Sequence, residues 1–207
     1  MIKLIDGKKE SRFFMKPVTL EKREGAADAR TIVGYAALFN SVSVNMGWFK
    51  EQIAPGAFDK TDLSDVVATF NHNPDLIQAR TKAKNLIVTV DNFGLKYEFE
   101  APNTTAGNDL LENVRCGNIQ SSSFTFQVRA AAWELLQNDP DGAEELRTIT
   151  DFSIVHELAP VVFPAYEDTE VALRSFTEER SRRNKPIIMP MYNRNIAELE
   201  LALRKRK

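Results

Sequence analysis

The sequence has few of the residues from which disulfides, metal sites and nucleotide sites are built. It contains one cysteine, Cys116, and two histidines, His72 and His156. A single cysteine excludes an internal disulfide and fits a reducing compartment, and so small a ligand set argues against structural zinc. The nine glycines are scattered, without the spacing of a dinucleotide-binding or phosphate-binding loop. We therefore expect no metal and no cofactor.

Long apolar runs are also missing. No run approaches the roughly 20 residues that a membrane-spanning helix needs, and residues 1–14 lack the apolar block of a signal peptide. With 207 residues, of which 43% are hydrophobic, the chain is expected to fold as one soluble domain around one core, perhaps followed by a tail, without membrane contact.

Charge divides the chain near residue 176. Residues 177–207 contain nine basic and four acidic side chains, whereas the preceding residues are net acidic. The segment ERSRRNKP reads as an exposed linker, and residues 194–206 read as a short amphipathic helix. We expect residues 1–176 to form the folded domain and residues 177–207 a removable or docking tail. Nucleic-acid binding ranks lower because aromatic residues are almost absent from the tail.

Most of the first 176 residues read as strands. β-branched and aromatic runs bounded by turn residues predict strands, and DNFG at residues 91–94 predicts a hairpin turn. One helix is expected, ending at Gly117. This pattern predicts a mainly β or α+β fold, a closed or nearly closed barrel with peripheral helices. The expected strands are residues 13–20, 31–39, 65–70, 85–90, 95–101, 119–133, 145–155 and 161–166, and the expected helix is 105–116.

Three serines stand at the start of one expected strand, in the segment GNIQSSSFTF of residues 117–126. Side chains alternate between the faces of a strand, so Ser122 shares a core face with the two phenylalanines. Ser121 and Ser123 point the other way, to a face expected to be exposed. A serine run in a strand is most often only a solvated face, but an exposed serine on a rigid strand could also hold a nucleophile.

A serine nucleophile in this chain has two possible histidine bases. His72 ends the apolar strand DVVATF and opens the turn NHNPD, and strand ends that feed loops often carry functional groups. His156 and Glu157 precede an apolar run, and on an extended strand they should face opposite sides, so that one of them reaches the site. Either could orient His72 as the third member of a triad.

The order and spacing of several segments resemble the prohead proteases of tailed bacteriophages, which are serine endopeptidases of capsid maturation. The resemblance covers about 140 residues in family order. It rests on GYAALFN (34–40), FKEQIAPGAF (49–58), DVVATFNHNPD (65–75), ARTKAKNLIVTVDNFGLKYEFEAPNT (79–104), GNIQSSSFTF (117–126) and ELAPVVFPAYEDTEVALR (157–174).

The resemblance implies roles for particular residues. It places the nucleophile at Ser123, the general base at His72 and the third member at Glu157, with His156 as the alternative third member. It also implies a β-barrel with peripheral helices, distantly similar to the herpesvirus assembly proteases.

The implied partners are the major capsid protein and the scaffolding protein or a scaffold segment, with the portal as a further candidate and with self-association. The implied place is inside the immature procapsid in the host cytoplasm, and the chain itself is an implied substrate. The alternative is a non-catalytic assembly or scaffolding component on the same fold.

Overall fold

The computed structural model describes residues 3–4, 9–14, 18–21 and 30–162. Its elements, in chain order, are β1 (Lys3–Leu4), β2 (Lys9–Phe14), β3 (Thr19–Glu21), β4 (Thr31–Leu38), β5 (Phe49–Ile53), β6 (Val67–Phe70), β7 (Asn73–Arg80), the 3-10 helix η1 (Thr81–Ala83), β8 (Leu86–Val90), β9 (Gly94–Glu100), α1 (Thr105–Arg115), β10 (Ser121–Leu135) and β11 (Glu145–Val161).

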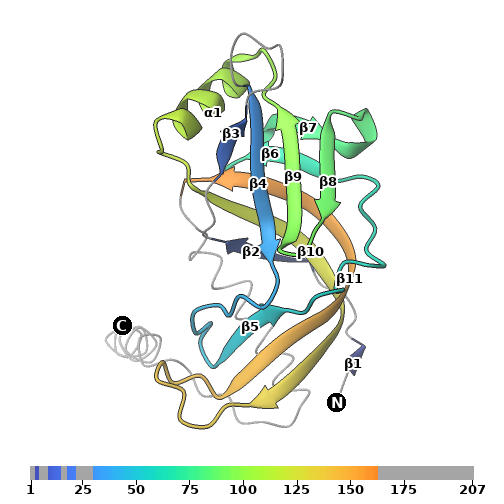
Figure 1. Cartoon of the computed structure of the whole chain (residues 1–207), viewed down its shortest axis with the longest axis vertical. Helices are drawn as coiled ribbons and strands as arrows, with labels where there is room; N and C mark the ends of the chain where they lie inside the picture. The colour runs from blue at the N-terminus through green and yellow to red at the C-terminus, as the bar shows by residue number, and fades with distance from the viewer. Residues whose placement is uncertain (1–2, 5–8, 15–17, 22–29, 163–207) are drawn as a thin grey trace, which may run out of the picture.

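Within the described residues the strands form two sheets. A seven-stranded sheet has the order β1-β10-β11-β6-β7, with β2 also paired to β10 and β5 to β11, and a four-stranded sheet has the order β3-β4-β9-β8. The long hairpin of β10 and β11 curves through the whole molecule, and the four-stranded sheet lies in front of its upper half (Figure 1). The expectation of a mainly β fold is confirmed.

The main core lies between the four-stranded sheet and the upper half of the β10–β11 hairpin. Phe124, Phe126 and Phe152 are fully buried, and Phe58 stacks on Phe152 with 4.5 Å between ring centroids. A second, smaller cluster surrounds Trp48 beside β5. The alternation of Phe124 and Phe126 toward the core agrees with the sequence pattern and fixes which face of β10 is left for the neighbouring serines.

Local signals in the sequence set two of the elements. The Thr104 side chain accepts a hydrogen bond from the Gly107 backbone N–H and so caps the amino end of α1. Gly117, with φ of 74°, follows the helix in the left-handed conformation that glycine adopts most readily. The expected turn at residues 91–94 joins β8 to β9, where Asp91 Oδ1 accepts hydrogen bonds from two backbone N–H groups.

The structure differs from the expected strands in several places. β1, β5 and β7 were not expected, and the strand expected at residues 13–20 corresponds to parts of β2 and β3. β11 continues to Val161 as one strand of 17 residues, although residues 145–155 and 161–166 were expected to be separate. Residues 163–166 and the whole of residues 177–207 lie outside the described residues, so the proposed tail stays a prediction.

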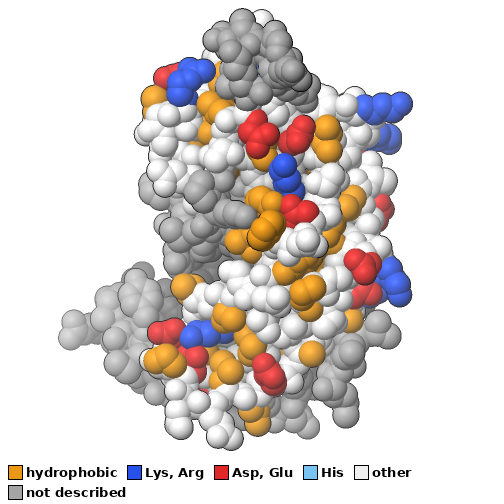
Figure 2. All heavy atoms as spheres, viewed as in Figure 1, with side chains coloured by type: hydrophobic (Ala, Val, Ile, Leu, Met, Phe, Trp, Pro, Cys, Tyr) orange, Lys and Arg blue, Asp and Glu red, His pale blue; other side chains and the backbone are white. Residues whose placement is uncertain are grey.

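The face of the molecule in Figure 2 carries apolar, acidic and basic side chains in a mixture, and neither histidine is seen on it. Among the described residues, no helix combines the length and the apolar character needed to cross a bilayer.

Candidate active site

The position of His72 is set by a two-residue hairpin turn between β6 and β7. Phe70 pairs with Asn73, and the two residues between them, Asn71 and His72, have φ of 56° and 57°. Two positive φ values in succession define the tight turn that suits the twist of a hairpin, and Asn and His tolerate this conformation better than most residues.

Two hydrogen bonds link this turn to β11. The backbone N–H of Asn71 donates to the Pro160 carbonyl at 3.0 Å, and its side-chain Oδ1 accepts from the Val162 N–H at 3.4 Å. The turn is therefore held against the far end of β11, and the His72 ring is directed back across the sheet.

Ser123 lies in the middle of its sheet, with β11 on one side and β2 on the other. It is opposite Ala159 of β11 and Phe13 of β2. Its side chain is fully buried, so the expectation of an exposed serine is wrong. The prediction assumed that only the aromatic face of β10 is buried, whereas the face that carries Ser121, Ser123 and Thr125 is buried as well.

The three serines have different environments. Ser122 is turned to the core, as expected, and its Oγ lies 2.8 Å from the Tyr97 hydroxyl. Ser121 shares the face of Ser123, but its side chain makes no hydrogen bond within the described part of the chain, whereas Ser123 Oγ lies 2.6 Å from His72 Nε2. Among the serines of this run, only Ser123 contacts a histidine in the described part of the chain.

The other nitrogen of His72 faces a carboxylate. His72 Nδ1 lies 3.2 Å from Glu157 Oε2, and Thr69 Oγ1 donates to Glu157 Oε1 at 2.5 Å. The side chains of Ser123, His72 and Glu157 thus form one continuous series of polar contacts. Thr69 fixes the carboxylate through the oxygen that does not face His72, and no pattern in the sequence pointed to this threonine.

A bulge in β11 brings Glu157 to the face of Ser123. Thr125 pairs with Glu157 and Phe126 pairs with Val155, so that His156 is an extra residue without a direct partner on β10. The extra residue lets apolar Val155 face the core while Glu157 takes the serine face. In regular alternation, residues 155 and 157 would share a face.

His156 is not part of the contact series. No hydrogen bond from His156 to Ser123 or His72 occurs among the described residues, and its Nε2 is buried without a partner there. Burial and the nearby Lys9 charge both lower the pKa of His156. Both conditions favour the neutral form of the His156 ring.

The pKa of Glu157 is lowered by its neighbours. Burial by itself raises this pKa, but hydrogen bonds from His72 and Thr69 and the charges of His72 and Lys9 outweigh burial. The carboxylate is therefore ionised at neutral pH. An ionised carboxylate on one ring nitrogen and a serine hydroxyl on the other can generate a nucleophile by proton transfer through the imidazole.

The described residues contain no group of three or more His, Cys, Asp or Glu side chains arranged to hold a metal ion.

Comparison with known proteins gives one match. A family model described as caudovirus prohead serine protease matches residues 16–183. No curated protein and no solved structure matches the chain. The matched residues include Ser123, His72 and Glu157.

Proposed function

Because this chain belongs to the family of caudovirus prohead serine proteases, we propose that it is a serine endopeptidase with Ser123 as nucleophile, His72 as general base and Glu157 as the residue that orients the base. The observation that carries the proposal is the contact series from Ser123 through both nitrogens of His72 to Glu157, at 2.6 and 3.2 Å.

The proposed reaction begins when His72 Nε2 takes the hydroxyl proton of Ser123 as Oγ attacks a peptide carbonyl carbon. Glu157 keeps the other proton on Nδ1 and stabilises the imidazolium. The same proton then passes from Nε2 to the leaving amine, which departs and leaves an acyl-enzyme. Water repeats the sequence: His72 takes its proton, the hydroxyl attacks the ester, and Ser123 recovers its hydrogen.

The proposed substrates are procapsid proteins. Family membership supports a role in capsid maturation, and within that role we propose cleavage of the scaffolding protein, or of a scaffold-like amino-terminal segment of the major capsid protein. The portal is a further candidate partner. The proposed place of action is the interior of the immature procapsid.

The test is incubation of the purified chain with the capsid and scaffolding proteins of its own phage. The wild type should cut at defined sites. Ser123→Ala should not cut, while Ser121→Ala, a change of equal size on the same face of β10, should retain activity. Full cleavage by Ser123→Ala would refute the proposed nucleophile. Absence of cleavage by a folded wild-type chain would favour the non-catalytic assembly role.

Self-cleavage is part of the proposal and concerns residues outside the described part of the chain. An exposed linker can be drawn out as an extended substrate, so the wild type should lose residues from about 177 onward on standing, and Ser123→Ala should keep them. Intact-mass measurement distinguishes the two. A wild-type chain that stays full length while it cleaves other proteins would rule out self-trimming.

A further inference from the structure

Strand β2 lies along the edge of β10 at the position of the candidate nucleophile. It pairs antiparallel with β10 over residues 122–127, with Phe13 opposite Ser123 and Ser11 opposite Thr125. The other edge of β10 is paired with β11. A peptide that approaches Ser123 as an added strand therefore meets an edge that β2 already occupies.

The backbone of β2 also contacts the nucleophile itself. Ser123 Oγ donates a hydrogen bond to the Arg12 carbonyl oxygen at 2.9 Å. A serine hydroxyl has one proton, and His72 Nε2, at 2.6 Å, needs that proton for base catalysis. The Arg12 carbonyl oxygen and His72 Nε2 therefore compete for this proton. With β2 in place, Ser123 Oγ faces the oxygen of the Arg12 carbonyl and not its carbon, which is the atom that a nucleophile attacks.

Two charged side chains of β2 hold the strand in this position. Arg12 Nε donates to Glu51 Oε1 at 2.6 Å, and Arg147 Nη1 donates to Glu10 Oε2 at 2.8 Å. Arg147 also pairs with Glu51 at 2.8 Å, independently of β2. If β2 departs, Glu51 and Arg147 therefore remain paired with each other, and departure does not leave a lone buried charge.

We propose that β2 occupies the substrate-binding edge of β10 and keeps the site latent, so that an extended peptide gains access to Ser123 only when β2 leaves. The inference rests on the proposed function. In this proposal β2 and an extended substrate bind the same edge of β10, and a peptide that pairs with β10 displaces β2.

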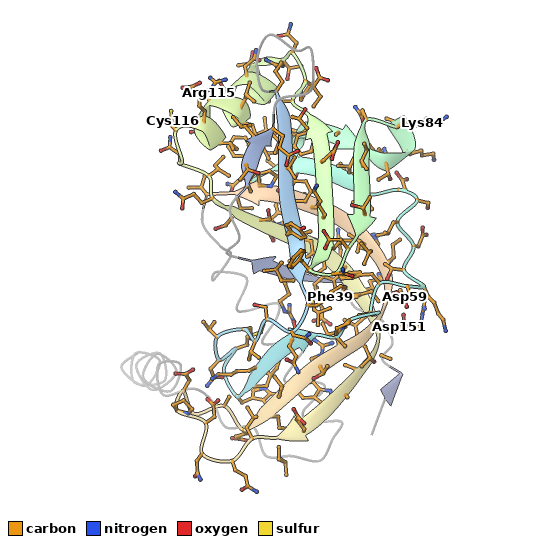
Figure 3. The ribbon with its side chains drawn as sticks, viewed as in Figure 1. Phe39, Asp59, Lys84, Arg115, Cys116 and Asp151 are labelled. Carbon is orange, nitrogen blue, oxygen red and sulfur yellow. The ribbon has the colours of Figure 1, made fainter. Side chains whose placement is uncertain are left out.

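A reversible crosslink between β2 and β10 tests the inference. Ser11 and Thr125 are directly opposite, and their side-chain oxygens are 2.9 Å apart, so the side chains of cysteines at these two positions would lie within reach of each other. The double change Ser11→Cys/Thr125→Cys is made in a Cys116→Ser background, because Cys116 is exposed at the end of α1 and would otherwise react (Figure 3).

The readout is the rate at which a rhodamine-bearing fluorophosphonate labels Ser123. The oxidised, crosslinked chain should be labelled at least tenfold more slowly than the reduced chain, and dithiothreitol should restore the rate. Ser11→Cys alone, in the same background, should show no response to dithiothreitol. Glu10→Gln, which weakens the attachment of β2 without changing the candidate triad, should be labelled faster than the wild type.

The outcomes separate the inference from the proposed function. Equal labelling of the oxidised and reduced double variant would show that Ser123 is accessible with β2 in place, and would overturn the inference while the proposed function stands. If Ser123 is not labelled in the wild type, in Glu10→Gln or in the reduced double variant, the proposed function fails and the inference fails with it.

Discussion

Ser122 and Ser123 are neighbours whose alanine variants should separate stability from activity. The Ser122 hydroxyl is fully buried and pairs with the hydroxyl of Tyr97, which is itself completely buried. Ser122→Ala leaves the Tyr97 hydroxyl without this partner. An unsatisfied buried polar group costs about 1 to 3 kcal/mol, so the thermal midpoint should fall by about 3 to 10 °C. Peptidase activity of the folded protein should be unchanged.

A double-mutant cycle measures the energy of the contact between the Ser122 and Tyr97 hydroxyls. Tyr97→Phe alone leaves the Ser122 hydroxyl without this partner and should cost a similar amount. Removing both hydroxyls leaves neither group unpaired, so Ser122→Ala/Tyr97→Phe should be nearly as stable as the wild type, with a coupling energy of about 1 kcal/mol or more. Urea unfolding of the four proteins measures the cycle, and proteolysis is measured alongside.

Ser123→Ala is the matched comparison, because it removes the same atom one residue away on the opposite face. It should abolish proteolysis while the protein remains folded. Strictly additive losses in the cycle would refute the assigned contact between Ser122 and Tyr97. Loss of activity in Ser122→Ala at unchanged stability would refute the assignment of the nucleophile.

Three further predictions follow from the site and from β2. His72→Ala should lower kcat by about 10⁴-fold or more because triad members act as a unit, whereas His156→Ala should change it little. Equal losses from both would favour a site with two histidines. Thr69→Val removes a hydrogen bond to a charged group, worth about 1.5 to 3 kcal/mol. The pKa of Glu157, measured by NMR, should rise and kcat should fall by about tenfold or more, and an unchanged pKa would contradict the contact. Burial raises the pKa of Glu10, but two neighbouring arginines lower it to about 2. Because the pKa of Glu10 is depressed in the folded state, ionised Glu10 stabilises the fold. This stabilisation is complete above the ordinary pKa of 4.5 and is lost as the pH falls toward 2. Urea titration should show that the free energy of unfolding falls less over that pH range for Glu10→Gln than for the wild type. Identical pH profiles for the two proteins would refute the interaction of Glu10 with the arginines.

The sequence predicted the parts of the site that depend on local pattern. Alternation along β10 separated Ser122 from Ser123, and the turn residues around His72 placed it at the end of a strand. The position of Glu157 could not be derived from alternation, because the bulge at His156 changes which residues of β11 share a face. A bulge depends on how two distant strands pair, and a single sequence does not show that pairing.

A buried charge explains why β5 was not predicted. β5 reads FKEQI, and Glu51 within it is buried, so its strand pattern places a carboxylate where an apolar residue is expected. Its arginine partners, Arg12 and Arg147, are 39 and 96 residues away in the chain. The same ion pairs hold β2 along the edge of β10 beside Ser123, and pairings between residues so far apart in the chain cannot be read from a local pattern.

The central claim is that Ser123 is the nucleophile and that His72 activates it. The most direct measurement is peptide mapping by mass spectrometry after reaction of the full-length protein with a fluorophosphonate. We predict one covalent adduct, on Ser123, whose formation is lost in His72→Ala. An adduct on Ser121 or Ser122, or an adduct on Ser123 that forms equally fast without His72, would contradict it.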